Sequence, residues 1–140
     1  MDALTEGMYD RLTGDETLAA MLAEWQGAPA VFTVEPVPPD AELPYLVTAG
    51  QVADAAFDTK TTRGRALMRD VRCYAEADGS TLIETIAERV RLLLHQHRLA
   101  IEGYDTLIAT ASGPVAANES EVYGRVVTVR LTVVEARAGS

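Results

Sequence analysis

The longest patterned stretch of the chain begins with a strand-like alternation and continues into a helix-like repeat. Over residues 66–76, Val71, Cys73 and Ala75 alternate with polar side chains, which predicts a strand with one buried face. Over residues 81–96 the apolar side chains recur every three or four positions, which predicts one long helix with a broad apolar stripe. The stripe consists of Ile83, Ile86, Ala87, Val90, Leu93 and Leu94. We expect this helix to cover one face of the sheet to which the strand belongs.

Shorter patterns lie on both sides of this unit. Residues 1–25 hold two short helical repeats, and the prolines between 35 and 40 predict a stiff extended connection. Trp25 is interpreted as a core anchor at the end of the second helix rather than as a platform for a ligand. Residues 136–140 are expected to fray. Further strands are predicted at 30–34, 44–48, 105–111 and 121–135.

Residues 53–65 follow neither period and predict a long polar loop between two strands. Lys60, the only lysine of the chain, lies in this loop together with two arginines. Asp54 and Asp58 are interpreted as solvated loop charges. A loop of this length in a compact domain is usually functional or mobile, so it is the first place to look for an interaction site.

The order of these elements predicts a single α+β domain over residues 1–140. We expect an antiparallel or mixed sheet of about 4–5 strands, with the main helix, 81–96, packed on one face and a short helix pair at the N-terminus. Strand 66–76, the main helix and strand 105–111 form one right-handed crossover if the two strands are parallel. The sequence leaves that pairing open.

Composition narrows the possible functions. A single cysteine excludes an internal disulfide and indicates a reducing compartment. The net charge of −9 argues against a general affinity for nucleic acid, which depends on neutralising phosphates. The N-terminal residues lack the features of a signal peptide, and no apolar run is long enough to span a membrane. We therefore expect a soluble protein with no membrane partner.

The sequence contains no recognisable catalytic motif. There is no phosphate-binding loop, dinucleotide fingerprint, nucleophile elbow or metalloprotease motif. His95 and His97 are two apart, and on a helix such residues point about 200° from each other, so they cannot bind one ion together. Cys73 falls on the predicted buried face and is interpreted as an inert apolar side chain. We expect no enzyme activity, no cofactor and no metal site.

Several features in this order resemble the tail-completion, or tail-terminator, family of long-tailed bacteriophages and gene transfer agents. They are the N-terminal helix pair, residues 43–47 after the proline-rich connection, the loop 57–64, and the strand 71–76 leading into a Ser/Thr-capped helix. The closing strand pair also fits. The resemblance covers residues 1–135, with Tyr74 at a position where the family pattern suggests tryptophan.

The resemblance implies a structural protein of the virion, at the head-proximal end of the tail, made in the bacterial host cytoplasm. It implies a homo-oligomeric ring, commonly a hexamer, that terminates the tail tube and joins it to the head connector. DNA would pass through the lumen as cargo without sequence-specific binding. The expected partners are other copies of the chain, the major tail-tube protein and the head–tail connector protein. A head-completion or connector-stopper ring protein, and a small α+β ligand-binding domain, are the alternatives.

We expect the polar loop to form the interface with another subunit or a partner. Its cations would meet the acidic N-terminal helices of the next subunit, a type of contact that sets register and orientation. The alternative is an ordinary solvated connection between two strands. The candidate interface residues are Asp58, Thr59, Lys60, Thr61, Arg63, Gly64 and Arg65.

Overall fold

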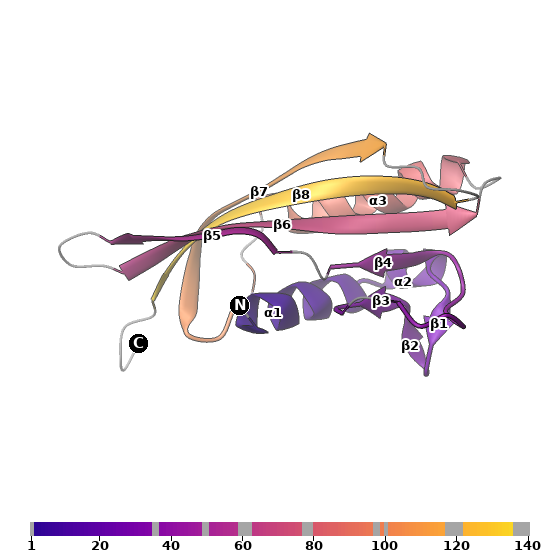
Figure 1. The fold of residues 1–140 in the computed structure, drawn as a ribbon, viewed down its shortest axis with the longest axis horizontal. Coiled ribbons are helices and arrows are strands. Elements are labelled where there is room, and N and C mark those ends of the chain that lie inside the picture. Colours follow the sequence, from indigo (N-terminus) through magenta and orange to yellow (C-terminus); the bar gives the residue numbers. More distant parts are fainter. Residues whose placement is uncertain are drawn as a thin grey trace.

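The fold is organised around a long mixed sheet whose apolar face is covered by helices (Figure 1). The computed structural model describes residues 2–34, 37–48, 51–58, 63–76, 80–96, 99, 101–116 and 122–135. Its helices are α1 (Asp2–Thr13), α2 (Glu16–Met21) and α3 (Ser80–Leu94). Its strands are β1 (Glu24–Trp25), β2 (Ala28–Pro29), β3 (Val31–Phe32), β4 (Tyr45–Val47), β5 (Gln51–Asp58), β6 (Arg63–Glu76), β7 (Tyr104–Ala116) and β8 (Val122–Glu135).

Among the described residues the main sheet has six strands rather than the predicted four or five. Its order is β3-β4-β6-β8-β7, and β5 pairs with β6 on the same side as β4. β3 and β4 are parallel, whereas the other pairs are antiparallel. β6 and β7 are both antiparallel to β8 and therefore parallel to each other. The predicted crossover through α3 thus exists between parallel strands, with β8 inserted between them.

The additional strand arises where we predicted a long loop. Residues 53–65 are not a loop: β5 pairs with the first half of β6, with Asp58 opposite Arg63 and Asp54 opposite Leu67. The period of two is weak in this segment because β5 lies at the end of the sheet that extends past the helices, where no core selects apolar side chains (Figure 1). Backbone pairing, which any of these residues can make, forms the strand instead.

The second helix is shorter than the sequence predicted. α2 ends at Met21, and Trp25 lies in β1 of a two-stranded hairpin. The turn of this hairpin is Gln26-Gly27, with φ values of 52° and 82°. Trp25 packs edge-on against Phe32, with 5.7 Å between ring centroids, and Phe32 packs in the same way on Tyr45 at 5.6 Å. Trp25 is only partly buried and is not a member of the main apolar cluster. The prediction of a core anchor on a helix is therefore wrong, and Trp25 packs in an aromatic row instead.

Strand β7 is longer than predicted and bends at Gly113. The register with β8 shifts between Thr106 and Ile108 and again between Ser112 and Val115. Gly113 has φ 103°, and a Cβ atom at this position would lie 2.7 Å from the carbonyl oxygen of Val126. Only glycine fits this bulge, so the strand continues past it instead of ending there.

The predicted core is confirmed. Val90 is fully buried in one apolar cluster with the rest of the α3 stripe, and the alternating residues of β6 and β8 belong to the same cluster. The helix α1 adds three buried residues to it. The fully or nearly fully buried members from these four elements include Leu4, Met8, Leu12, Val71, Cys73, Ile86, Leu94, Val127 and Val129.

Asp15 connects the helices to one another. Its carboxylate caps α2 by accepting a hydrogen bond from the backbone N–H of Leu18 at 2.8 Å. It also accepts two hydrogen bonds from Arg89 of α3, at 2.9 and 2.6 Å. The Arg89 guanidinium is the main reason that the pKa of the Asp15 carboxyl lies below its ordinary value. One carboxylate therefore both starts a helix and fixes it to the main helix.

Candidate assembly surface

The predicted interface residues lie on a projecting pair of strands, which we call the arm: β5 together with residues 63–67 of β6. Figure 1 shows the arm extending past the helices at one end of the molecule, and β5 makes its main contacts with β6. A hollow of about 400 Å³ lies at its base. The residues that line this hollow are Ala56, Arg63, Gly64, Arg65, Tyr104 and Glu135. Part of the arm is therefore uncovered by the chain's own core.

Arg65 holds the arm together and is not presented to a partner. Its Nε atom donates to Oδ1 of Asp54 at 2.7 Å, and a second guanidinium nitrogen pairs with Oδ2. Hydrogen bonds to Asp54 and then to Tyr104 raise the pKa of Arg65 above its ordinary value. Asp54 is mostly buried, with 14% of its side chain exposed, so our interpretation of it as a solvated loop charge is wrong. The arm has an internal ion pair that the sequence alone did not indicate.

Arg63 is the predicted cation that the arm does expose. Its side chain is exposed and makes no ion pair in the part of the chain that the structure describes. Gly64 lies between Phe57 and Val134 within the sheet, so it is a strand residue here rather than a hinge. The side chain of Asp58 and the residues Thr59, Lys60 and Thr61 lie outside the described residues.

The two long edges of the sheet differ. The edge of β7 is occupied by the end of α3: the N–H of Gln96 donates to the carbonyl of Ala109 at 2.8 Å, and the N–H of Ala111 donates to Nδ1 of His95 at 3.1 Å. Pro114 removes a further donor from this strand. Among the described residues no strand pairs with the outer edge of β5. In the described part of the chain, the arm therefore carries an open strand edge along β5.

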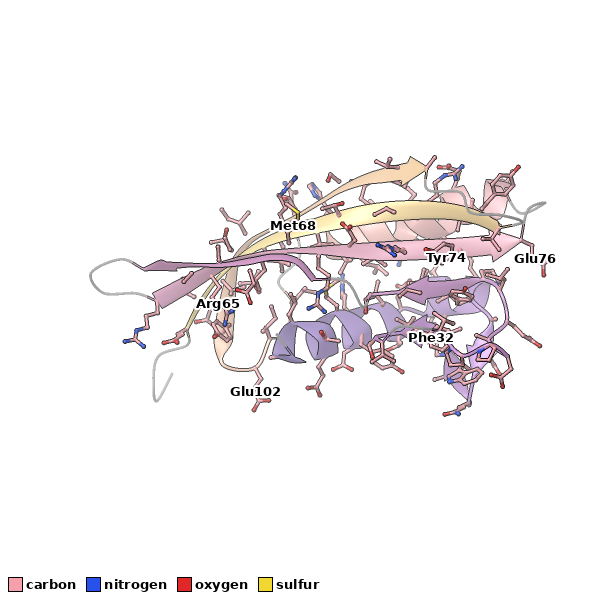
Figure 2. All side chains as sticks on the ribbon, in the orientation of Figure 1. Phe32, Arg65, Met68, Tyr74, Glu76 and Glu102 are labelled. Atoms are coloured by element: carbon pink, nitrogen blue, oxygen red, sulfur yellow. The ribbon has the colours of Figure 1, made fainter. Side chains whose placement is uncertain are left out.

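A groove of about 450 Å³ lies between α1 and the turn that leads into β7. Four exposed carboxylates surround it, and two of them are four residues apart on α1 and so share one face of that helix. Figure 2 shows one of the others, Glu102, at the turn beneath the arm. The carboxylates belong to Glu6, Asp10, Glu102 and Asp105, and the remaining lining residues are Ala3, Leu99, Ile101, Tyr104 and Thr106.

The sequence predicted only half of this groove. It indicated acidic N-terminal helices, but Glu102 and Asp105 are almost 100 residues away and were not recognised. No local pattern relates the two segments. A hydrophobic contact brings them together, because Ile101 and Leu99 are buried in or against the same core as Leu4 of α1.

Two features that the sequence raised, a metal site and a reactive cysteine, can be compared with the described residues. These residues contain no group of three or more His, Cys, Asp or Glu side chains placed to hold a metal ion. The Cys73 thiol is buried, which raises its pKa to about 12 and leaves it almost entirely protonated. No helix of the described part is long and apolar enough to cross a membrane.

The chain is similar to known proteins both in sequence and in fold. The model of a family described as tail completion protein gp17 matches residues 6–136. Among solved structures, a chain of the virion of a native gene transfer agent particle superposes with a TM-score of 0.75. The two sequences are 19% identical, and the match covers 94% of each chain. A search of curated proteins found no match.

Proposed function

The chain belongs to the tail completion protein family, and from this premise we propose that it forms a ring, most simply a hexamer, that closes the head-proximal end of a tail tube. Members of the family are structural proteins of the virion tail rather than enzymes. In this proposal the ring joins the tube to the head connector. Its partners are other copies of the chain, the major tail-tube protein and the connector protein.

The arm is the observation that carries the proposal. The outer edge of β5 has no strand partner among the described residues, and an open strand edge invites pairing with another chain. Part of the opposite edge of the same sheet is occupied by His95 and Gln96, whereas no described strand pairs with the outer edge of β5. A ring, in which each subunit meets a neighbour, gives the arm a partner without continuing into an open fibre.

The charge of the chain supports the passage of DNA through such a ring. A net charge of −9 per subunit makes binding of the phosphate backbone unfavourable. An acidic assembly would let the genome slide through its lumen without being held. The few exposed cations, Arg63 among them, are then available for contacts between proteins.

The direct test is a cryo-EM map of particles from cells that express the chain, compared with particles from cells in which its gene is deleted. We expect a closed ring of copies between tube and connector, and its loss should leave filled heads without tails. One isolated copy per tail would contradict the proposal. A ring that stays on the connector of heads released without tubes would favour the head-completion alternative.

A further inference from the structure

We propose that the groove between α1 and the β7 turn receives the arm of a second copy of this chain, with Arg63 seated among the carboxylates. This inference rests on the proposed ring and names the two surfaces that would meet in it. The arm and the groove are different surfaces of one chain. Their pairing is therefore heterologous, the type that closes into a ring when the rotation between subunits allows it.

Charge complementarity favours this occupant. The groove carries four exposed carboxylates, and no Arg, Lys or His is among its described lining residues. The arm presents Arg63 without an ion pair in the described part of the chain. Two nearby cations are engaged elsewhere: Arg65 pairs with Asp54, and Arg11 donates to the carbonyl of Leu93. Arg63 is therefore the described cation of the arm that is free to fill the groove of another subunit.

The shape of the groove suits an arginine better than a small ion. Its lining includes Leu99 and Ile101, and the apolar surface that they present can pack against the methylene groups of an arginine side chain. The guanidinium can then donate to two carboxylates at once, whereas an ammonium group acts as a single point charge. A lysine at position 63 should consequently bind more weakly than arginine.

Tyr104 connects the two surfaces within each subunit. It lines the groove and the hollow at the base of the arm, where Arg65 is another lining residue, and after Asp54 it contributes to the raised pKa of Arg65. A neighbour's arm seated in the groove would therefore restrain a side chain that also lines the base of the subunit's own arm. Binding of one arm in a groove should then favour binding of that subunit's own arm in the next groove around the ring.

Cysteine cross-linking on assembled particles tests the pairing. The only native cysteine, Cys73, is buried, so only the introduced thiols should form disulfide cross-links. We expect the double variant Arg63→Cys with Glu102→Cys to give, under mild oxidation, a ladder of covalent oligomers that ends at the ring size. Each single variant alone should give none, and a mixture of the two single variants should give dimers only. Arg63→Cys with Glu24→Cys, on the distant β1 hairpin, is the matched control and should also give none.

The same particles, imaged by cryo-EM, separate the two proposals. A ring with the ladder supports the pairing. A ring without the ladder overturns the pairing and leaves the ring intact. Isolated copies with no ladder overturn the proposed function, and the pairing with it.

Charge exchange gives a second test that does not need a new thiol. Arg63→Glu should reduce the yield of tailed particles at least tenfold, and Arg63→Lys should retain part of it. Adding Glu102→Arg to Arg63→Glu should restore particles, because the attractive pair is rebuilt with the signs reversed. Full yield from Arg63→Glu alone, at unchanged melting temperature, would also overturn the pairing.

Discussion

The same two strands, β6 and β8, run through two very different regions of this molecule. In one half they lie under α3, where Val71, Val127 and Val129 are fully buried. In the other half β6 continues into the arm, where Ala55 and Ala56 of β5 are exposed and Arg65 forms an ion pair with Asp54. Leu67 is the residue of this segment that still belongs to the apolar core. Burial stabilises the first half, whereas exposed ion pairs add little. We infer that one half maintains the fold and the other is available for assembly.

The largest expected effect is in the covered half. Val90→Asp places a charge in the fully buried stripe, at a cost on the order of several kcal/mol, comparable to the whole stability of a domain of this size. We expect insoluble or unfolded protein. Leu92→Asp, two residues away on the same helix but 48% exposed, is the control and should melt cooperatively. Soluble, cooperatively melting Val90→Asp protein would contradict the assignment of the core.

Thiol reactivity should separate the two halves clearly. The pKa of about 12 leaves Cys73 with about a thousandfold less thiolate than an ordinary thiol of pKa 9.0, and burial also blocks reagents. In the variant Ala56→Cys the new thiol lies on the exposed arm. Mass spectrometry after maleimide treatment should show one rapid addition, with the second only under denaturing conditions. Two additions of equal rate would show that the covered half opens readily.

Asp15 should have an intermediate effect. Asp15→Ala removes both the cap of α2 and the pair with Arg89, and a helix cap alone contributes about 1 kcal/mol. Asp15→Asn keeps a capping oxygen and should lose less. Chemical denaturation of both variants at neutral pH measures the difference.

The Asp15 contribution should also depend on pH. Its folded pKa is below the ordinary 3.8, so the carboxylate stabilises the fold above that value. The contribution is lost as the pH falls through the folded pKa, because the folded state must then take up the proton. The wild type and Asp15→Ala should therefore converge in stability in strong acid. A constant difference down to the lowest pH would show that the charge of Asp15 does not matter.

The smallest effects on stability are expected in the arm. Arg65→Ala removes the ion pair with Asp54 and should lower the melting temperature less than Asp15→Ala, because the Arg65 side chain is 38% exposed and screened by solvent. Arg63→Glu, two residues away, should leave the melting temperature unchanged. Differential scanning calorimetry of the free chain tests both. A large loss of stability from Arg63→Glu would mean that the arm supports the fold as well as assembly.

Sequence patterns predicted the elements that touch the core and missed those that do not. The stripe of α3 and the alternation of β6 and β8 are periodic because one face of each element is buried and the other is exposed to solvent. The structure confirms all three elements. β5 has no alternation between buried and exposed faces because it lies beyond the helices, so its residues were predicted to form a loop. The end of α2 was also misplaced, because a turn at Gln26-Gly27 moves Trp25 into a hairpin.

The sequence by itself determined the α+β class, the main helix and its apolar stripe, the buried inert cysteine and the exposed cation at position 63. These follow from periodicity and from local chemistry, which act between near neighbours. Only the tertiary structure decided that β8 lies between β6 and β7. It also decided that Arg65 forms an ion pair with Asp54 inside the arm. The meeting of two distant acidic segments around one groove is the third such feature, and its carboxylates belong to Glu6, Asp10, Glu102 and Asp105. Each of these depends on which distant segments share the core, and the burial of apolar surface that brings them together is not directional.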